Sequence, residues 1–473
     1  MTETILDDIE EQARARPDHP ALVTENGEDL SYGALADRIK HWTERFTADG
    51  IRNGDLCGFM ASPGPTYIAA ALGIMDAGGV LVPIPEEHRE KSDSLYFEKL
   101  ALDWVIDEKK EFTPHQRNHS EAERPWNDPD LDPAYVRFTS GTTGDQKGVL
   151  LGHESIRERT EIANRTLSIS PDDRILWLLS MDHHLVVSIL LYLRNGATIL
   201  LPEHTLAGPV LSFADRHDAT VLYATPYHYR MLTGADQPGA LSSLRMAIST
   251  AEELPVETAR DFDETYDQPV SQGLGIIEVG LPAVNLQKPR EKPESVGPVR
   301  PEYEVTLLDD DDEPVTASGE RTGELHIDGP GLFDAYLHPW KPREEVCGPY
   351  GFPTGDQARL DADGDLYLVG RRTNRINRAG NKFFCEEVEQ VLNRHPDVRE
   401  SRVYGKSHPK LGELPYAQIV PTAPEAMPSG SELNEHCRDH LAEYKIPRSF
   451  EQVSELPRTP TGKIKRDGPE AQE

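Results

Sequence analysis

The sequence is poor in cysteine, in positive charge and in long apolar runs. Its four cysteines among 473 residues are scattered, without the spacing of a metal site or of a disulfide framework. No apolar stretch approaches the roughly 20 residues that a membrane-spanning helix needs. Residues 1–20 are acidic and polar, a composition that argues against a signal peptide. We therefore expect a cytoplasmic protein with reduced thiols and no membrane partner.

Positive charge is scarce relative to negative charge. Lysine and arginine together number 49 against 82 aspartates and glutamates, which gives a formal net charge of -33. A chain with this balance repels nucleic acid, so we expect none as a partner. The acidic run 309–313 (DDDDE) lacks the glycine and the spaced ligands of a calcium loop, and it predicts a solvated loop. Composition leaves the oligomeric state open.

Strand-like and helix-like segments alternate through the first part of the chain. This order predicts a largely parallel sheet covered by helices. The apolar strand segments are residues 56–62, 80–85, 175–180, 197–202, 219–226 and 245–250. From residue 296 onward the pattern changes to short strands with turns, which predicts a β-rich subdomain.

A compositional break at residues 371–378 (RRTNRINR) separates this part from a helix, two strands and a second helix. The chain is also too long for one hydrophobic core. We therefore predict an α/β fold with a large N-terminal domain (1–370) of helix-covered, mostly parallel sheets plus the β-rich subdomain. A small, mobile α+β domain (371–473) is expected to follow.

The densest chemical signal is the segment 135–155 (YVRFTSGTTGDQKGVLLGHES), in which glycines and hydroxyls follow an apolar strand. Glycines let backbone N–H groups turn toward an anion, and hydroxyls and a lysine supply further donors. The pattern favours a phosphate-binding loop over a flexible surface loop, although it is not a Walker loop. The candidate nucleotide-binding residues here are Thr139, Ser140, Gly141, Thr142, Thr143, Gly144 and Lys147.

This loop resembles the signature loop of the adenylate-forming superfamily, which contains acyl-CoA synthetases, peptide-synthetase adenylation domains and luciferases. Further motifs similar to those of the family follow in its order, at residues 245–255, 271–280, 323–337, 352–357, 377–389 and 456–466. The resemblance spans residues 5–466. It implies the family's fold and its reaction, in which ATP activates a carboxylic acid as acyl-AMP and pyrophosphate is released.

The resemblance also implies roles for individual residues. Glu278 stands at the Mg²⁺-binding position, and Lys463 stands where the family's catalytic lysine bridges the substrate carboxylate and the α-phosphate. Asp356 corresponds to the carboxylate that accepts both ribose hydroxyls, a task that suits two acceptor oxygens. The remaining nucleotide-binding positions implied are Ser249, Thr250, Ala251, Gly273, Leu274, Gly275 and Arg371.

The segment 181–185 (MDHHL) lies where the family places part of its acyl pocket. Two adjacent histidines before an apolar helix favour a site over a structural histidine, and His183 is also a candidate catalytic residue. Asp182 raises a rival possibility, because peptide-synthetase domains hold the substrate α-amino group with an aspartate nearby. The candidate pocket residues are His183, His184, Tyr223, Tyr227 and Gly280. Their mainly apolar character favours an aromatic or medium aliphatic acid.

A thiol attacks the adenylate in the family's second step, after the small domain rotates. The acceptor implied is coenzyme A, with the phosphopantetheine of an acyl carrier protein as the alternative. Gly380 and Lys382 stand where the family forms its thiol channel, and Thr373 stands at the hinge. A plain surface charge is an equally good interpretation of Lys382.

Two positions in the loop 273–278 depart from the family pattern. Leu274 replaces an aromatic residue that stacks on adenine, and Ile277 replaces a threonine whose hydroxyl reaches the α-phosphate. Three explanations stay open for the second change: Thr142 or Lys463 compensates, ATP turnover is slow, or the chain is a non-catalytic nucleotide-binding relative.

Overall fold

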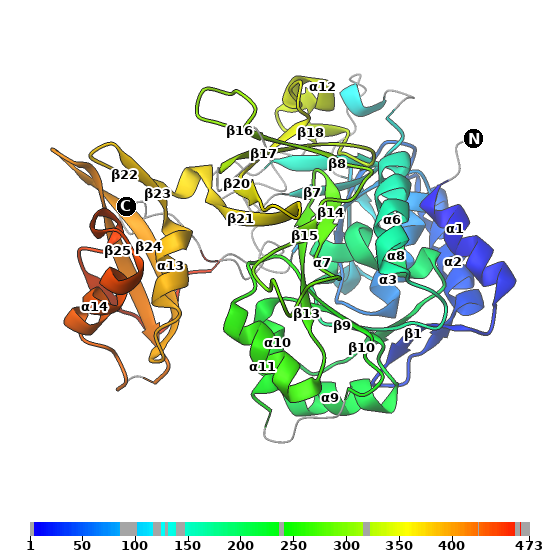
Figure 1. Cartoon of the computed structure of the whole chain (residues 1–473). Helices are drawn as coiled ribbons and strands as arrows, with labels where there is room; N and C mark the ends of the chain where they lie inside the picture. The colour runs from blue at the N-terminus through cyan, green and yellow to red at the C-terminus, as the bar shows by residue number, and fades with distance from the viewer. Residues whose placement is uncertain are drawn as a thin grey trace. The chain divides into compact units, whose positions relative to one another are not determined.

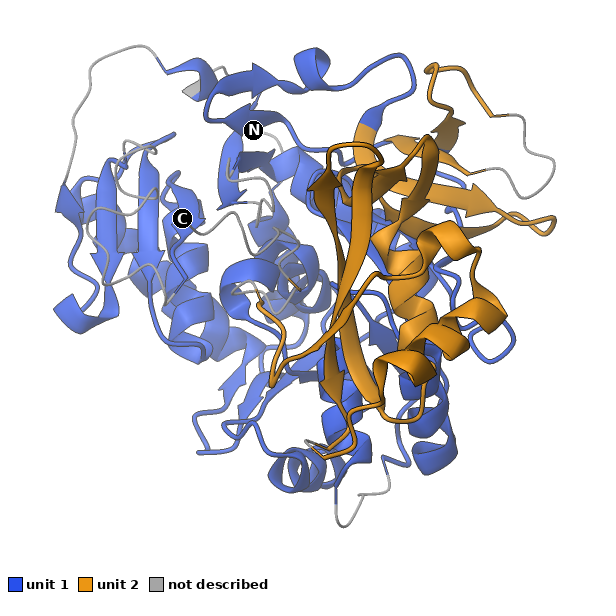
Figure 2. Cartoon of the chain, turned by 90° about the vertical axis from the view of Figure 1, so that its left-hand side faces the viewer, with its two compact units in different colours: residues 1–139, 147–304, 328–352 blue, residues 140–146, 305–327, 353–473 orange. Residues whose placement is uncertain are grey.

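The computed structural model describes residues 4–85, 102–116, 124–127, 131–138, 147–235, 241–315, 322–423, 425–458 and 464. The chain forms two compact units. Unit 1 comprises residues 1–139, 147–304 and 328–352, and unit 2 comprises residues 140–146, 305–327 and 353–473 (Figure 2). The predicted domain boundary between residues 370 and 371 falls within the last strand of the β-rich sheet of unit 2, and it stays a prediction.

Unit 1 contains an eight-stranded sheet in the order β14-β13-β12-β11-β9-β10-β1-β2 (Figure 1). Its strands are β1 (Pro20–Thr24), β2 (Leu30–Ser31), β9 (Arg174–Trp177), β10 (Thr198–Leu201), β11 (Val221–Ala224), β12 (Met246–Ser249), β13 (Val270–Ile276) and β14 (Gly280–Val284). The run from β1 to β13 is parallel, and only the edge strands β2 and β14 pair antiparallel. Parallel strands buried on both faces are uniformly apolar. This apolar character allowed the sequence to predict β9, β10, β11 and β12.

Helices α9 (Ala207–Arg216), α10 (Pro226–Thr233) and α11 (Val256–Tyr266) pack on one face of this sheet. Phe213, Tyr229 and Phe262 from these helices share a core with Leu176 and Leu222 from the strands. Alternation along a strand sends Trp177 and Tyr223, the neighbours of these two leucines, to the opposite face. The candidate site uses residues of that opposite face.

A second eight-stranded sheet of unit 1 has the order β19-β18-β8-β7-β4-β3-β5-β6. Its strands are β3 (Leu56–Met60), β4 (Val80–Pro83), β5 (Trp104–Asp107), β6 (His115–Gln116), β7 (Pro133–Phe138), β8 (Gly148–Gly152), β18 (Ala335–Leu337) and β19 (Trp340–Pro342). The other helices of unit 1 are α1 (Ile5–Ala15), α2 (Tyr32–Asp49), α3 (Pro65–Asp76), α6 (His153–Leu167), α7 (Met181–His184), a π-helix (Leu185–Ile189), α8 (Leu190–Arg194) and α12 (Arg343–Val346). Short elements are η1 (Glu108–Lys110), η2 (Pro125–Asn127) and β15 (Gly297–Pro298).

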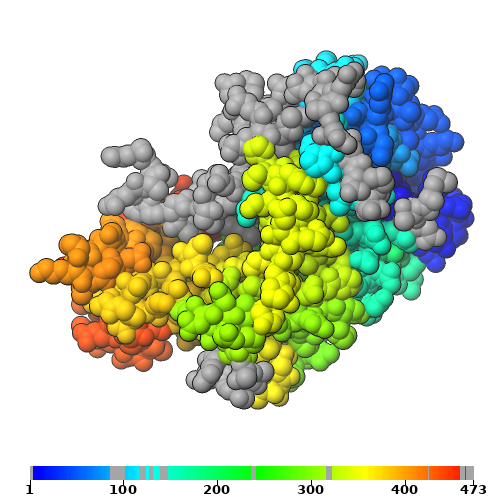
Figure 3. All heavy atoms as spheres, turned by 90° about the horizontal axis from the view of Figure 1, so that it is seen from above, coloured from blue at the N-terminus to red at the C-terminus, as the bar shows by residue number. Residues whose placement is uncertain are grey.

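Local sequence explains several of these elements. Helix α1 begins at a capping box, in which the Asp7 N–H donates to Thr4 Oγ1 and the Thr4 N–H donates to Asp7 Oδ2. It ends at Ala15, ahead of Pro17, as helices commonly do before a proline. Helix α3 is buried along most of its length, which suits its apolar sequence. Helix α12 buries no residue, and the yellow to yellow-green part of the chain that contains it lies at the surface in Figure 3.

Unit 2 contains two sheets. In the β-rich part, β21 (Asp365–Arg371), β20 (Phe352–Leu360), β17 (Gly323–Asp328) and β16 (Glu304–Leu308) pair in this order. In the C-terminal part, β23 (Asn381–Phe384), β22 (Arg375–Arg378), β25 (Gly412–Pro421) and β24 (Val398–His408) pair in this order, and β26 (Phe450–Gln452) joins β25 in parallel. Its helices are α13 (Cys385–Leu392) and α14 (Gly430–His440), with turns η4 (Arg372–Asn374) and η5 (Glu443–Lys445).

The C-terminal part has its own core, in which Phe383, Val388, Val403, Ile419 and Leu433 are buried together. The predicted fold class is confirmed: helix-covered, mostly parallel sheets, a β-rich part and a small α+β part are all present. None of the described helices combines the length and the apolar character that crossing a bilayer requires.

Candidate nucleotide and acyl site

Several predicted site residues lie outside the described part of the chain. They are Thr139, Ser140, Gly141, Thr142, Thr143, Gly144 and Lys463. The candidate site is therefore built from the residues on either side of these segments.

The carboxyl ends of β9, β11, β12 and β13 meet at one edge of the first sheet. Tyr223 pairs in register with Trp177 on one side and with Ile248 on the other, and Ser249 pairs with Gln272. The chain therefore leaves all these strands at the same edge. Ligands of open α/β sheets bind outside this edge, so the predicted adenine-binding and acyl-binding segments emerge where a ligand site is expected.

The adenine-binding segment is buried at this edge. Ser249 is fully buried, and among the described residues its hydroxyl has no hydrogen-bond partner. The Thr250 N–H donates to the carbonyl of Ala224 at 3.0 Å. Ala251 has a φ of +74°, a left-handed conformation that costs free energy in a residue with a Cβ and that often marks functional sites. The buried Ser249 hydroxyl has no hydrogen-bond partner among the described residues, and Ala251 nearby is strained. Both features are typical of a segment that binds a ligand.

The glycines of β13 approach this segment closely. A Cβ added to Gly275 would lie 3.5 Å from Thr250 Oγ1, and one added to Gly273 would lie 3.7 Å from the carbonyl oxygen of Ser249. Leu274, between them, is buried. The predicted nucleotide-binding residues of the two motifs are thus neighbours in space.

Tyr223 connects the nucleotide and acyl segments. Burial raises the pKa of Tyr223, although a side-chain hydrogen bond with Thr250 and the charge of Arg137 oppose the shift. The phenol therefore stays protonated and neutral at physiological pH. The Thr250 N–H donates to the carbonyl of Ala224, the residue after Tyr223, so the two predicted segments are neighbours at the edge of the sheet.

Aromatic rings surround Tyr223. Trp177 stacks with it at a centroid distance of 6.5 Å and an interplanar angle of 15°. His184 lies edge-on to both, at 6.0 Å from Trp177 and 6.4 Å from Tyr223, and Tyr192 lies edge-on at 6.3 Å and 6.5 Å. We call Trp177, His184, Tyr192 and Tyr223 the aromatic group. The sequence singled out His184 and Tyr223 but neither Trp177 nor Tyr192.

The backbone after His184 is a π-helix, Leu185–Ile189. Single π-turns inside helices are rare and occur frequently at functional sites. The sequence predicted an ordinary helix here, because an apolar run carries no signal for the wider turn. The structure corrects that expectation, and the π-helix begins directly after His184.

Two candidate pocket residues lie in other surroundings. Ser180 Oγ is 3.1 Å from Nδ1 of His183. Tyr227 is 60% exposed at the start of α10 and lies edge-on to His228, whereas the aromatic group is mostly buried. The roles of His183 and Tyr227 stay predictions.

The predicted metal ligand and the predicted phosphate-binding lysine meet at Tyr336. Oε1 of Glu278 accepts a hydrogen bond from the Tyr336 hydroxyl at 3.0 Å, and Lys147 Nζ lies 4.6 Å from the centroid of the same ring. Burial and the neighbouring Glu278 raise the pKa of Tyr336, so the phenol remains a donor at physiological pH. An oriented carboxylate of this kind fits Mg²⁺, which prefers oxygen ligands.

Arg159 on α6 holds the loop that carries Glu278. Its guanidinium donates to the carbonyl of Ile277 at 2.8 Å and twice to the carbonyl of Gly331, at 3.0 and 2.6 Å. Burial lowers the pKa of Arg159 to about 10, which leaves it charged at neutral pH. A Cβ on Gly331 would lie 2.8 Å from the Arg159 backbone nitrogen, and one on Gly280 would lie 3.3 Å from Arg159 Cβ. Glycine at these positions allows the close approach.

The predicted ribose-binding residues of unit 2 form an ion pair. Arg371 Nε donates to Asp356 Oδ1 at 2.8 Å, and the two residues are register partners on β21 and β20. Asp356 is buried and its N–H donates to Thr354 Oγ1, whereas half of the Arg371 side chain is exposed. The ion pair orients the Asp356 carboxylate, as acceptance of two hydroxyl hydrogen bonds requires.

The predicted thiol-channel lysine is also paired. Lys382 Nζ lies 2.6 Å from Asp310 Oδ2, and Arg375 lies 2.7 Å from Asp310 Oδ1. These two cations lower the pKa of Asp310 to about 2. Residues 309–313 are all exposed, as expected of a solvated loop, and Asp310 forms its two ion pairs at the surface. Gly380, in the turn before Lys382, has a φ of +89°, and a role for it and Lys382 in a thiol channel stays a prediction.

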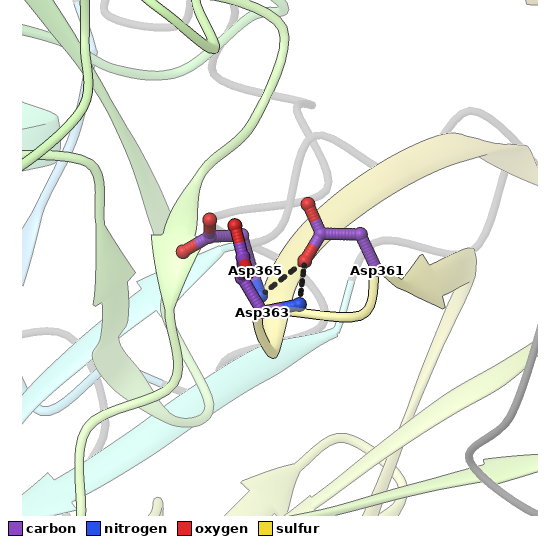
Figure 4. Close-up of side chains that lie close together, drawn as sticks. All are labelled: Asp361, Asp363 and Asp365. Atoms are coloured by element: carbon purple, nitrogen blue, oxygen red, sulfur yellow. Dashed lines mark hydrogen bonds between the residues drawn. The ribbon is translucent and has the colours of Figure 1, made fainter.

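A second acidic group lies in the turn between β20 and β21. Carboxylate oxygens of Asp361, Asp363 and Asp365 lie within 4.8 Å of one another (Figure 4). Asp361 accepts hydrogen bonds from the backbone N–H groups of Asp363 and Asp365 and from the Tyr367 hydroxyl. These bonds stabilise the turn and account for the position of Asp361 without a metal ion.

Known proteins identify the family. The model of the AMP-binding enzyme family matches residues 9–337, and that of the AMP-binding enzyme C-terminal domain matches residues 387–463. The chain belongs to the adenylate-forming superfamily of AMP-binding enzymes. The resemblance seen in the sequence is thereby confirmed.

Curated relatives of this AMP-binding enzyme include coenzyme A ligases. It is 28% identical to a sulfoacetate–CoA ligase of Cupriavidus necator, over 95% of this chain and 94% of that protein. It is 27% identical to a feruloyl-CoA synthase of an Amycolatopsis species, over 96% of both chains. The solved structure of the anthranilate CoA ligase AuaEII in complex with anthranoyl-AMP aligns with a TM-score of 0.83 at 23% identity, over 98% of this chain and 97% of that one.

Proposed function

We propose that the protein uses ATP to convert a small carboxylic acid into acyl-AMP and then transfers the acyl group to coenzyme A. The pairing of β11 with β12 carries the proposal, since the Thr250 N–H donates to the carbonyl of Ala224, the residue after Tyr223. This pairing sets the segment expected to bind the nucleotide beside the segment expected to bind the acid. Attack of a carboxylate on an α-phosphate requires this adjacency, because holding two reactants together removes much of the entropic barrier.

Each candidate residue then has a task in the proposed reaction. In unit 2, Asp356, oriented by Arg371, accepts the ribose hydroxyls. In unit 1, Ser249 and Thr250 offer hydroxyls to the base and the acid. Glu278, oriented by Tyr336, is the residue that we propose holds Mg²⁺. The ion supplies positive charge to the phosphate oxygens of ATP. Lys147 and Lys463 supply further cationic charge, which two reacting anions require.

Coenzyme A is the acceptor that we favour, since full-length relatives at 27% and 28% identity are named as coenzyme A ligases or synthases. Purified protein would be supplied with ATP, MgCl₂ and a panel of aryl, aliphatic, sulfonated and amino acids. Coenzyme A or a pantetheinylated carrier protein would then be added, and thioesters would be measured by mass spectrometry. We expect acyl-CoA. Loading of the carrier alone would contradict the acceptor, and absence of acyl-AMP with every acid would contradict the first step.

A second candidate function is nucleotide binding without turnover, and the side chain of Ile277 favours it. The backbone at this position is fixed by Arg159, so the loop has little freedom to bring another donor to the missing hydroxyl's place. Calorimetric titration distinguishes the two functions. Binding of ATP with no acid-dependent release of pyrophosphate would support the second candidate.

A further inference from the structure

The indole N–H of Trp177 is a buried donor that the fold does not satisfy. Trp177 is 3% exposed, and its Nε1 has no hydrogen-bond partner among the described residues. A buried donor without an acceptor costs folding free energy, and such groups are rare in native proteins. Trp104 in the second sheet shows the usual solution, since its Nε1 donates to Asp55 Oδ2 at 2.8 Å.

The unsatisfied donor lies within the aromatic group. Trp177 and Tyr223 are register partners on neighbouring strands and therefore point to the same face of the sheet. His184 lies edge-on to both rings. Tyr223 also pairs in register with Ile248 of β12, the strand that leads into the nucleotide segment, so Tyr223 lies between Trp177 and that strand. An acyl group whose carboxylate reaches the nucleotide would extend along this group.

We propose that Trp177 determines acid specificity by donating its indole N–H to a hydrogen-bond acceptor on the acyl group. The inference rests on the proposed function. The substrate would be a carboxylic acid with an apolar body about the size of one ring. This body would carry an oxygen acceptor at a distance from the carboxylate. The aromatic group supplies flat apolar contacts, and Nε1 supplies one directional contact. Binding sites of this composition fix ligand orientation with a few polar groups.

Selectivity between isosteric acids tests the inference. The unaltered protein and Trp177→Phe would be compared on methoxybenzoic acids and on the ethylbenzoic acids of the same substitution pattern, with pyrophosphate release as the readout. Trp177→Phe keeps a ring and removes the donor. We expect the ratio of kcat/KM for methoxy over ethyl acids to fall roughly tenfold at one ring position, the effect of losing one hydrogen bond.

Trp104→Phe is the matched control, because it removes the same indole from a position outside the site and breaks a hydrogen bond that is present. We expect this variant to lower the melting temperature more than Trp177→Phe does and to leave the selectivity ratio unchanged. An equal ratio in the unaltered protein and Trp177→Phe would overturn the inference.

If Trp177→Phe does not fold, the unaltered protein alone still tests whether the acyl site recognises an oxygen acceptor on the acid. A preference for methoxy over ethyl acids at one ring position supports the inference, and equal kcat/KM for every isosteric pair overturns it. Absence of pyrophosphate release with every acid, including those of the broader panel, would contradict the proposed function itself. Pyrophosphate release that does not differ between the methoxy and ethyl acids would contradict only the role of Trp177.

Discussion

Two charged regions of the molecule are held in opposite ways. The loop of Glu278 is fixed by Arg159, which is 2% exposed and bonds to two backbone carbonyls. Within the described part of the chain, Lys382 pairs with Asp310 alone, and these side chains are 42% and 57% exposed. Buried hydrogen bonds to a charge are costly to break, whereas exposed ion pairs exchange with water and salt at little cost. A fixed, buried loop around Glu278 suits the adenylate-forming step that we propose. The exposed pair of Lys382 and Asp310 suits a segment that is expected to change partners between the adenylation and thiol-transfer steps.

Arg159→Met should have the largest effect, because it leaves the carbonyls of Ile277 and Gly331 buried without donors. We expect the free energy of unfolding to fall by about 3 kcal/mol. Pyrophosphate release should fall roughly 100-fold, since the loop of Glu278 loses its orientation. Urea denaturation and a pyrophosphate assay check both values. Arg165→Met, on the exposed face of the same helix, is the control, and equal behaviour of the two variants would contradict the role of Arg159.

Glu278→Gln should preserve the fold and impair chemistry. The amide keeps the shape of the side chain and can still accept from Tyr336, but it removes the negative charge that we propose binds Mg²⁺. We expect kcat for adenylate formation to fall roughly 100-fold and the required Mg²⁺ concentration to rise. Tyr336→Phe should cause a smaller loss, since the carboxylate remains. A Glu278→Gln variant with an unchanged Mg²⁺ titration would contradict the assignment.

Ile277→Thr should restore the donor that the family places near the α-phosphate. Because Arg159 holds the backbone of this residue, the new hydroxyl should project from a fixed position. We expect kcat for adenylate formation to rise about threefold to tenfold, the range of one hydrogen bond. Ile276→Thr, at the neighbouring position, is the control. An unchanged kcat would indicate that other residues already supply this contact.

Asp310→Asn should have the smallest effect, because the ion pairs are exposed. The pKa of Asp310 is lowered from 3.8 to about 2, so the pairs stabilise the folded chain above pH 3.8 and lose this effect as the pH falls toward about 2. Urea denaturation of both proteins across this range should show their difference shrinking with falling pH and with added salt. Asp311→Asn, in the same loop, is the control, and a difference that grows on acidification would contradict the pairing.

Sequence predicted β9, β10, β11 and β12 of the first sheet, because strands buried on both faces are uniformly apolar. The glycine-rich β13 was not among the predicted strands. Resemblance assigned roles to Glu278, Asp356 and Arg371, and these stay predictions. It did not reveal Arg159, whose acceptor carbonyls lie 118 and 172 residues away. Asp310 pairs with residues 65 and 72 positions distant.

Sequence analysis identified His184 and Tyr223 of the aromatic group but not Trp177 and Tyr192, for a related reason. The position of Trp177 beside Tyr223 depends on the register of two parallel strands, which composition does not encode. The π-helix after His184 depends on packing around an apolar run. Contacts of this kind arise from the tertiary fold and leave no local pattern in the sequence.

Acid-dependent exchange of pyrophosphate into ATP tests the central claim most directly. The unaltered protein, Lys463→Ala and Lys465→Ala would be assayed with Mg²⁺ and the acid panel. We predict exchange with at least one acid, its loss in Lys463→Ala by roughly 100-fold or more, and its retention in Lys465→Ala. Exchange that is independent of the acid, or equal in the two lysine variants, would contradict the account.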